Sequence, residues 1–370
     1  MKYYLIAGEA SGDLHGALLV QALKAKDPRA DIRFWGGDDM AAAVGQAPVR
    51  HIRDLAIMGF VEVLAHLHTV LGNIRFCKQD ILSFHPDVVV GIDYPGFNLK
   101  IEAWAHKHGL RTVHYISPNL WAWKKGRIRS MKKNLDLLCY ILPFEEKFFA
   151  SNRMAQALYV GHPLLDAVKD KPSHSGPQHP LPTIVLMPGS RRQELKHNLP
   201  LMVHLAEQHP EFHFIVAGMS LLGETIYRQH IPSSSGIDIV YDQTYSLLSD
   251  AHAAIVCSGT ATLEAALFNV PQVVCYRANP ISIAIAKTIV SRRIRYISLV
   301  NLIADQTVVT ELIQEDFNTS RLEHEFHLIA SDDANRTRIF NQYAELRTLL
   351  GGSGASNRTA QAILDLINKP

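Results

Sequence analysis

The feature that most constrains the fold is a succession of short apolar runs that alternate with helical patterns. Most runs are continuous rather than alternating in polarity, so both faces of each strand must be covered, as in a parallel sheet between two layers of helices. The runs fall into two series. The first series contains 3–8, 32–37, 87–92, 111–117, 137–143 and 157–161, and the second contains 183–189, 212–218, 237–241, 253–259 and 271–277.

Two such series in a chain of 370 residues indicate two α/β domains. The segment 169–182 between them holds four prolines and two serines, a composition typical of a linker. We expect two tandem, doubly wound, Rossmann-like domains, 1–170 and 183–345, joined by the linker 171–182. The remaining 346–370 is expected to be a helical segment that packs on the first domain or on a partner subunit. Ligands of this architecture bind at the carboxyl ends of strands, so the expected active site is the cleft between the domains.

The four cysteines occur singly, and no pair has CxxC spacing. Cys139, Cys257 and Cys275 lie in strand-like runs, and the fourth is Cys77. This pattern favours a reducing compartment and argues against a disulfide framework or a zinc site. The start of the chain is predicted to be a first strand rather than a signal peptide, and no window approaches the roughly 18 apolar residues of a membrane span. We therefore expect a cytosolic protein that can still touch a membrane from that side.

Residues 8–16, GEASGDLHG, follow the first predicted strand. Their glycines do not match the GxGxxG fingerprint, which counts against a nicotinamide or flavin cofactor. Two interpretations stay open. Ser11 or Asp13 caps the following helix, or Glu9 and Ser11 recognise ligand hydroxyls beside the N–H groups of the helix start.

A second loop, VVVGIDYPGFN at 88–98, carries Asp93 to the end of a buried strand, and Pro95 then starts a helix. Asp93 is either an ordinary cap or turn residue, or a carboxylate tuned as a general base in a position that faces ligands.

Two loops of the second domain suit a diphosphate. Gly189 and Ser190 end a strand, and Arg191 follows at a helix start, where its planar guanidinium can pair with phosphate oxygens; a surface salt bridge is the alternative. In the other loop five small residues precede a helix, so a phosphate can approach the backbone N–H groups. They are Ser258, Gly259, Thr260, Ala261 and Thr262. Glu264 is expected in the first helical turn, as a dipole partner or as an acceptor for a ribose diol. Together these loops point to a nucleotide-sugar glycosyltransferase.

The segment 116–133, ISPNLWAWKKGRIRSMKK, combines two tryptophans with six Lys or Arg residues and no acid, although the formal net charge of the chain is only +2. Nucleic acid, a membrane surface and a phosphorylated substrate are its three candidate partners. The nearly neutral chain and the lack of a known nucleic-acid motif argue against nucleic acid.

Taken together, the motifs resemble the lipid-A-disaccharide synthase family along nearly the whole chain. The resemblance rests on AGEASGD at 7–13, MGFVEVL at 58–64, GIDYPGFN at 91–98, YISPNLWAWKKGRI at 115–128, YVGHPL at 159–164, PGSRRQE at 188–194, SGTATLE at 258–264 and NLIADQTVVTELIQ at 301–314. It implies a GT-B fold and an inverting transfer of 2,3-diacylglucosamine from UDP to 2,3-diacylglucosamine 1-phosphate. The implied products are UDP and the β-1,6 disaccharide phosphate of lipid A, and neither a metal nor another cofactor is expected.

The resemblance also implies roles for individual residues. Asp93 is the leading candidate for the catalytic base, and Glu9 is the alternative, because the first loop should face the same cleft. Tyr94 stands where many relatives carry a small residue, which leaves Asp93 in place but changes the local fit. The expected UDP contacts in the second domain are Gly189, Ser190, Arg191, Ser258, Gly259, Thr260, Ala261, Thr262, Glu264, Tyr276 and Asn301, while Glu311 and Gln314 match without a clear role.

The first domain is expected to bind the acceptor and to face the membrane. The implied substrates are acylated and lie in the cytoplasmic leaflet, where Trp favours the headgroup layer and each Lys or Arg gains roughly 1 kcal/mol from anionic lipid. As a helix, 58–74 would turn an apolar face toward either the core or acyl chains. The expected acceptor and lipid contacts are Ser11, His15, Met58, Phe60, Val63, Leu64, Leu67, Leu71, Trp121, Trp123, Lys124, Lys125 and Arg127. We expect a homodimer, peripherally attached to the inner membrane of a Gram-negative bacterium.

Two other functions fit parts of the pattern. A UDP-sugar epimerase of the same architecture would bind UDP alike, but it would need no acceptor and no acyl-binding surface. A non-enzymatic lipid-binding or nucleic-acid-binding protein would have no reason to place Asp93 and Arg191 at strand ends.

The segments 58–74 and 121–133 are predicted to attach the protein to anionic membranes. Binding to anionic vesicles should weaken at about 1 M salt, because the screening length there is only about 3 Å. Sedimentation with anionic and neutral vesicles at low and high salt measures the effect. Equal binding to both kinds of vesicle at every salt concentration would contradict a role for the basic segment.

Overall fold

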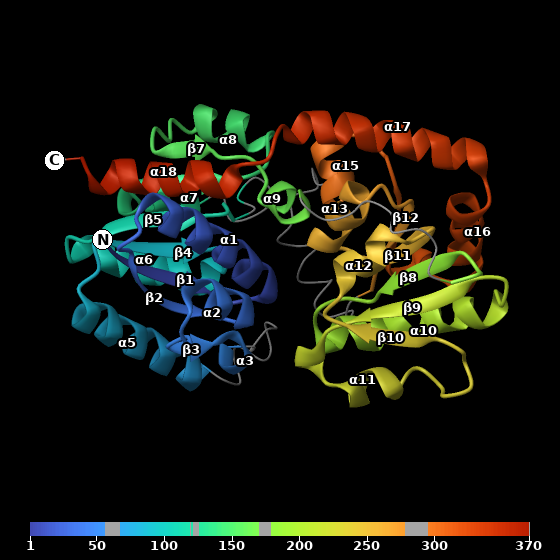
Figure 1. Cartoon of the computed structure of the whole chain (residues 1–370). Helices are drawn as coiled ribbons and strands as arrows, with labels where there is room; N and C mark the ends of the chain where they lie inside the picture. Colours follow the sequence, from blue (N-terminus) through green and yellow to red (C-terminus); the bar gives the residue numbers. More distant parts are fainter. Residues whose placement is uncertain (56–66, 119, 121–125, 170–178, 278–294, 370) are drawn as a thin grey trace. The chain divides into compact units, whose positions relative to one another are not determined.

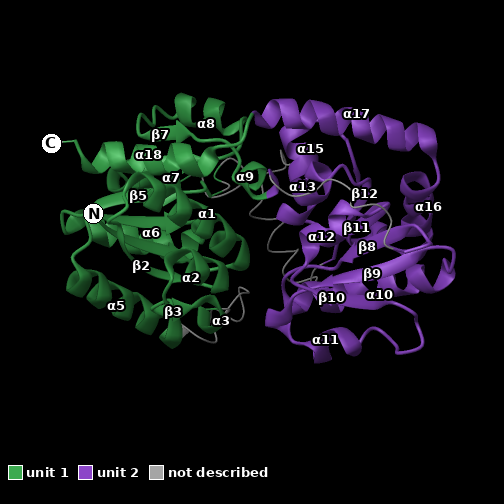
Figure 2. Cartoon of the chain, viewed as in Figure 1, with its two compact units in different colours: residues 1–167, 352–370 green, residues 168–351 purple. Residues whose placement is uncertain are grey.

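The computed structural model describes residues 1–55, 67–118, 120, 126–169, 179–277 and 295–369 (Figure 1). They form two compact units (Figure 2). Unit 1 consists of Met1–Ala167 and Gly352–Pro370, and unit 2 consists of Val168–Gly351. Each unit has its own parallel sheet and its own hydrophobic core.

Unit 1 is built on a seven-stranded parallel sheet in the order β3-β2-β1-β4-β5-β6-β7. Its strands are β1 (Lys2–Ala7), β2 (Asp31–Gly36), β3 (Arg50–His51), β4 (Val88–Ile92), β5 (Arg111–Tyr115), β6 (Leu137–Tyr140) and β7 (Ala157–Tyr159). The chain extends the sheet from β1 toward one edge and from β4 toward the other. The neighbouring carboxyl ends of β1 and β4 are therefore a topological switch point, the usual ligand position in such sheets.

The helices of unit 1 surround this sheet. They are α1 (Ala10–Lys26), α2 (Asp38–Val44), α3 (Ile52–Leu55), α5 (Leu67–Phe84), α6 (Pro95–Lys107), α7 (Arg127–Asn134), α8 (Glu145–Ser151), α9 (Leu164–Val168) and α18 (Ala355–Ile367). On the side of α5 and α6 the core contains the fully buried side chains of Tyr4, Ile6 and Trp35. The indole N–H of Trp35 donates to Tyr4 OH at 2.8 Å, so this aromatic core leaves neither polar group unsatisfied.

Helix α18 completes unit 1 although all of unit 2 precedes it in the sequence (Figure 2). It packs against α1, β5 and β6. The Asp166 carboxylate caps its first turn by accepting hydrogen bonds from the N–H groups of Gly354 and Ser356, the latter at 2.8 Å. Arg358 adds a hydrogen bond from Nε to Val160 O at 2.7 Å. These contacts tie the segment after unit 2 to the end of the segment before it.

Unit 2 repeats the architecture with a six-stranded parallel sheet in the order β10-β9-β8-β11-β12-β13. Its strands are β8 (Thr183–Met187), β9 (His213–Gly218), β10 (Asp238–Tyr241), β11 (Ala253–Cys257), β12 (Gln272–Tyr276) and β13 (Thr310–Ile313). Its helices are α10 (Arg192–Gln208), η1 (Ser220–Leu222), α11 (Glu224–Arg228), α12 (Thr244–Ser249), α13 (Thr260–Leu267), α15 (Leu299–Ala304), η2 (Gln314–Asp316), α16 (Thr319–Ala330) and α17 (Asp333–Leu350). Here the switch point lies between β8 and β11.

The two parallel sheets confirm the predicted fold class, and each of the eleven apolar runs contains a strand. β3 and β13 were not predicted from the sequence. β3 has only two residues, and Glu311 interrupts the apolar pattern of the four-residue β13. Most of the predicted linker 171–182, namely 171–178, lies outside the described residues.

All four cysteines are buried free thiols. No helix in the described part of the chain is both long and apolar enough to span a membrane. Within the same residues, no group of three His, Cys, Asp or Glu side chains is arranged to hold a metal ion.

Candidate active site

The candidate site of unit 1 lies where β1 and β4 end side by side. β4 is followed directly by Asp93 and Tyr94, whose backbones are both left-handed, with φ of 47° and 49°. That conformation costs roughly 1–2 kcal/mol for each such residue, a strain found mainly at functional turns. The Asp93 N–H donates to Tyr115 O at 2.8 Å, which fixes this elbow against β5. The predictions that Asp93 ends a buried strand and that Pro95 begins a helix are confirmed.

A fully buried amide, that of Asn98 on α6, ties the two strand ends together. Its Nδ2 group donates to Asp93 O at 2.8 Å, to Ile6 O at 3.1 Å and to Ile92 O at 3.3 Å. Backbone carbonyls beyond a strand end lack a sheet partner, and leaving them buried without one is costly. The Asn98 amide therefore holds the backbone that carries Asp93.

Tyr94 lies flat against the loop that follows β1. A Cβ added to Gly8 would stand only 2.3 Å from Tyr94 Cδ1, so the ring requires glycine at that position. The ring also stacks on Phe97, with centroids 5.7 Å apart. Burial raises the pKa of Tyr94, and the charge of Glu9 raises it further. The structure thus brings Glu9 close to the Asp93 elbow and accommodates the large residue that follows Asp93.

The prediction that Ser11 or Asp13 caps the first helix is wrong, because α1 already begins at Ala10. Glu9 occupies the N-cap position, and no side-chain hydrogen bond caps the helix there. The buried Asp13 carboxylate instead caps α2, accepting hydrogen bonds from three backbone N–H groups at 2.6, 3.0 and 3.2 Å. Ser11 lies half-buried in the first turn of α1.

A buried histidine–carboxylate pair lies beside the Asp93 elbow. His114 of β5 is paired in register with Gly91 of β4, and its Nδ1 is 2.7 Å from Glu102 Oε1 on α6. Burial alone would lower the pKa of His114, but the charge and hydrogen bond of Glu102 and the charge of Asp93 raise it overall, against an opposing effect of Arg127. Sequence reasoning did not find this pair, because no local motif connects a strand residue to a residue of the preceding helix.

The predicted acceptor and lipid contacts are only partly described. Met58, Phe60, Val63, Leu64, Trp121, Trp123, Lys124 and Lys125 lie outside the described residues. His15 is buried on α1 with its ring edge-on to His162, and burial lowers the pKa of His15 to about 4, so it is uncharged at neutral pH. Leu67 begins α5, Leu71 on that helix is 55% exposed, and Arg127 begins α7.

In unit 2 the loop after β8 places Arg191 at the N-cap of α10. The Glu194 carboxylate accepts hydrogen bonds from the N–H groups of Ser190 at 2.9 Å and of Arg191 at 3.2 Å. A Cβ on Gly189 would meet Glu194 Cβ at 2.5 Å, so glycine is needed there. Glu194 also pairs with the Arg191 guanidinium at 3.2 Å, yet the arginine side chain stays 49% exposed. The Glu194 carboxylate therefore occupies the N–H groups at the start of α10 that could otherwise bind an external anion. The Arg191 side chain of this loop remains accessible to solvent.

The loop after β11 is open to an anion. The N–H groups of Gly259, Thr260 and Ala261 at the start of α13 make no hydrogen bond within the described part of the chain. Thr262 is fully buried, and its hydroxyl donates to Gly259 O at 2.9 Å. The Ser258 hydroxyl donates to a backbone carbonyl at 3.1 Å. A phosphate at this helix start would thus meet backbone N–H groups rather than these two hydroxyls.

Glu264 lies deeper in α13 than predicted. The helix begins at Thr260 and has no acid in its first turn, so the predicted place of Glu264 in that turn is wrong. Tyr245 OH donates to Glu264 Oε1 at 3.2 Å. Burial raises the pKa of Glu264 from 4.5 to about 7, with the Tyr245 hydrogen bond acting in the opposite direction. A carboxyl group with its pKa raised in this way holds a proton to higher pH than usual, and the protonated form can donate as well as accept a hydrogen bond.

A second buried amide, that of Asn198 on α10, ties the strand ends of unit 2. Its Nδ2 group donates to Pro188 O at 3.1 Å and to Cys257 Sγ at 3.3 Å, and its Oδ1 accepts from the Arg277 N–H at 3.1 Å. It therefore spans the ends of β8, β11 and β12. Tyr276, the last residue of β12, lies at this same edge.

Asn301 is fully engaged inside unit 2. Its Nδ2 group donates to Val309 O and to Glu311 Oε1, both at 2.9 Å, and its Oδ1 accepts from the N–H groups of Val308 and Val309. Glu311 in turn accepts hydrogen bonds from Ser298 at the start of α15. The amide of Asn301 thus has no donor or acceptor left for a nucleotide, which does not fit its predicted role as a UDP contact.

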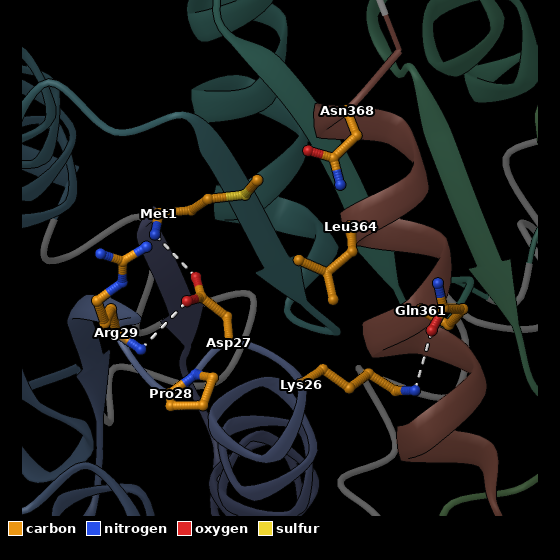
Figure 3. A pocket seen from close by; sticks show the side chains of 8 residues that line it. All are labelled: Met1, Lys26, Asp27, Pro28, Arg29, Gln361, Leu364 and Asn368. Atoms are coloured by element: carbon orange, nitrogen blue, oxygen red, sulfur yellow. Dashed lines mark hydrogen bonds and ion pairs between the residues drawn. The ribbon is translucent and has the colours of Figure 1, made fainter.

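A surface hollow of about 710 Å³ lies elsewhere in unit 1 (Figure 3). It is lined by Met1, Lys26, Asp27, Pro28, Arg29, Gln361, Leu364 and Asn368. The Met1 amine and the Arg29 N–H both donate to the Asp27 carboxylate, at 2.8 and 3.2 Å. The hollow adjoins the amino end of β1, whereas sheets of this kind bind ligands at their carboxyl ends, so it is not part of the candidate site.

The sequence also matches the profile of a known family. The profile described as Lipid-A-disaccharide synthetase matches residues 3–366. The chain belongs to the lipid-A-disaccharide synthase family. Synthases of that name from Syntrophus aciditrophicus (strain SB) and Chromohalobacter salexigens are each 36% identical to it, and each alignment covers 99% of this chain and 97% of the relative. The resemblance seen in the motifs is confirmed, and this member of the synthase family is a glycosyltransferase.

Solved structures share the fold of this synthase-family chain at low sequence identity. UDP-GlcNAc 2-epimerase from Neisseria meningitidis, bound to UDP-GlcNAc, has a TM-score of 0.66 and 14% identity, and covers 99% of this chain and 100% of its own. The glycotransferase of kitacinnamycin has a TM-score of 0.63 and 16% identity, over 99% and 98%. Such identities show the fold alone, so the epimerase activity is not carried over.

The residues that sequence reasoning missed are those that hold the synthase-family site in place. Asn98 and Glu194 are the last residues of the motifs GIDYPGFN and PGSRRQE. Their membership in these motifs was the sequence signal that could have identified them. Asn198 lies farther along its helix, as the seventh residue of α10, and outside any motif that was identified. Their contribution became visible only with the backbone carbonyls and N–H groups that they bind.

Glu264→Gln is predicted to stabilise the fold above pH 7. The folded pKa of about 7 exceeds the ordinary 4.5, so stability falls as the pH rises between these values, and the loss is complete above about pH 7. Glutamine cannot ionise, so the variant should gain about 1–3 kcal/mol at pH 8 and little at pH 4. Urea unfolding at both pH values measures the difference. Glu345→Gln, which alters an exposed acid of α17, is the matched control, and equal effects of the two substitutions would count against an explanation from the raised pKa of Glu264.

Proposed function

We propose that the chain condenses UDP-2,3-diacylglucosamine with 2,3-diacylglucosamine 1-phosphate, giving UDP and the β-1,6-linked lipid A disaccharide 1-phosphate. The observation that carries this proposal is the family match over residues 3–366. Two features of the geometry support it. Unit 1 presents an acid at a strained strand end, and unit 2 presents an anion-accepting helix start and an exposed arginine.

In the proposed reaction Asp93 is the general base. The acceptor 6-hydroxyl is a poor nucleophile while protonated, and the anomeric carbon of the donor gains positive charge as UDP departs. A carboxylate beside the hydroxyl removes its proton as the new bond forms, a contribution of roughly 10²–10⁴ in rate. The fixed elbow supports this role, because Tyr115 and Asn98 hold the N–H and the carbonyl of Asp93. Glu9 is the alternative base, because its loop adjoins the same strand ends.

Arg191 and the start of α13 are proposed to stabilise the leaving diphosphate. The N–H groups of 259–261 and the positive end of the helix favour an anion, and the planar guanidinium donates in pairs to phosphate oxygens. This preorganised positive charge takes the part that a metal ion has in other transferases. Because Glu194 already binds the N–H groups at the start of α10, the diphosphate is directed to α13. Tyr276 and Glu264 are proposed to contact the uridine.

Acylated substrates require a membrane surface, and we propose peripheral attachment to the cytoplasmic face of the inner membrane. The segments proposed for it, 58–74 and 121–133, carry the apolar and the basic residues respectively. Residues 58–66 and 121–125 of these segments lie outside the described part of the chain, so the proposal rests on their sequence.

Asp93→Asn is predicted to lower turnover at least a hundredfold while UDP affinity stays unchanged, because the base is lost and the nucleotide contacts are not. Turnover and calorimetric UDP binding should be measured for Asp93→Asn and for Glu9→Gln. If Glu9→Gln shows that loss while Asp93→Asn stays within about tenfold of the unmodified enzyme, Glu9 is the base.

Arg191→Ala is predicted to weaken UDP binding by about 1.5–3 kcal/mol, the range for a hydrogen bond to a charged group. The matched control is Arg192→Ala, which removes the neighbouring exposed arginine and should change the affinity little. Calorimetry compares the two variants. Equal affinities would show that the diphosphate does not use Arg191.

The enzyme is predicted to be a homodimer, on the strength of the family resemblance. Light scattering at micromolar concentration should report twice the chain mass of 41.3 kDa. A mass near that of one chain would contradict the prediction.

A further inference from the structure

A polar cluster lies inside unit 1, and the proposed reaction has so far used only its Asn98 amide. It consists of Asn98 and Glu102 on α6 and His114 on β5, with side chains that are at most 1% exposed. Gly91 makes room for it. A Cβ at that position would lie 2.1 Å from Glu102 Oε1 and 2.9 Å from Asn98 Cβ, so α6 can bring the cluster against the sheet only over a glycine.

Each member of the cluster keeps one polar atom without a partner among the described residues. These atoms are Asn98 Oδ1, Glu102 Oε2 and His114 Nε2. Buried polar atoms are nearly always hydrogen-bonded, and a fully buried ion pair with unmet hydrogen bonds is often no better for stability than apolar packing. The cluster is therefore better explained by a functional role at the neighbouring site than by a contribution to the stability of the fold.

The backbone connects this cluster to Asp93. His114 pairs with Gly91 across β4 and β5, and neighbouring strands lie about 4.8 Å apart. Asp93 follows Gly91 by two residues, and its N–H is bonded to the carbonyl of Tyr115, the residue after His114. Its own carbonyl accepts a hydrogen bond from Asn98 at 2.8 Å. The elbow is thus attached to the cluster from both its strand side and its helix side.

Three charged groups act on the His114 imidazole: Glu102 from α6, Asp93 from the elbow and Arg127 from α7. Its neighbour on β6 is the apolar Leu138. Burial lowers the pKa of His114, the two carboxylates raise it by a larger amount, and Arg127 lowers it. Linkage is reciprocal, so a protonated imidazole favours the ionised form of Asp93 as strongly as ionised Asp93 favours the protonated imidazole.

We propose that His114, held by Glu102, is a positioning residue for the base, and that its imidazolium keeps the Asp93 carboxylate ionised and ready to take the proton of the acceptor hydroxyl. This inference rests on the proposed role of Asp93. The proton passes from the hydroxyl to Asp93 alone, and neither His114 nor Glu102 touches the substrate.

The coupling can be measured without turnover. Histidine-selective NMR of the full-length protein follows the pKa of His114, whose resonance is identified by its absence from His114→Gln. Asp93→Asn should lower that pKa, because the substitution removes one of the charges that raise it. The matched control is His209 of unit 2, which lies between Glu211 at 2.8 Å and Glu323 at 2.6 Å and should titrate unchanged. An unchanged titration of His114 would overturn the proposal.

The pH profile of turnover tests the consequence. His114→Gln should move the acid limb of the kcat profile upward by roughly one pH unit, a tenfold loss at low pH, with UDP affinity and acceptor KM within about twofold. The double variant Glu102→Gln/His114→Gln leaves no charge in the cluster, so it replaces the single variant if that one fails to fold, and its acid limb should also move upward. A lower kcat with an unchanged acid limb would show that His114 has only a structural role, and that result would overturn the proposal.

The two proposals fail in different ways. If Asp93→Asn keeps turnover within about tenfold, Asp93 is not the base, and the proposed chemistry fails whatever His114 does. If Asp93→Asn abolishes turnover but leaves the titration of His114 unchanged, only the positioning role is rejected.

Discussion

Both candidate sites depend on the same constraint, which is that two parallel strands end side by side while the chain leaves them toward opposite edges of the sheet. Beyond such ends the backbone groups have no sheet partner, and a loop placed there would be loosely held. In each unit one buried asparagine supplies the missing bonds, Asn98 in unit 1 and Asn198 in unit 2. An amide suits the position because it carries two donor hydrogens and an acceptor oxygen in one small plane. The loops that carry Asp93 and Arg191 are held by these amides.

The two units use this shared arrangement differently. In unit 1 the ring of Tyr94 covers Gly8, which fills the place where a phosphate approaches the first loop of nucleotide-binding domains. In unit 2 Glu194 occupies the N–H groups at the start of α10, after β8, whereas those at the start of α13, after β11, make no hydrogen bond within the described residues. This difference in what occupies the strand ends supports assigning the nucleotide to unit 2 and the acid chemistry to unit 1.

Much of the fold could be predicted from the sequence, because short continuous apolar runs that alternate with helical patterns indicate strands covered on both faces. Asp93 and Arg191 were placed correctly at strand ends for the same reason, since the end of an apolar run is visible in the sequence. What escaped prediction depends on partners distant in the chain. Asp13 caps a helix that begins 25 residues later, at Asp38, and the His114–Glu102 pair joins a strand to a helix. Contacts between residues in different elements cannot be inferred from the spacing of residue types in the sequence.

The position of α18 has a consequence for how the molecule assembles. Its hydrogen bond from Lys26 to Gln361 joins residues 335 positions apart, and all of unit 2 is made on the ribosome between them. Closing so long a loop is slow for an unfolded chain, but a folded unit 2 shortens it by bringing its own two ends near each other. The surfaces of α1, β5 and β6 that receive α18 are therefore open until unit 2 has been synthesised. Unit 1 can therefore be completed by α18 only after unit 2 has been made.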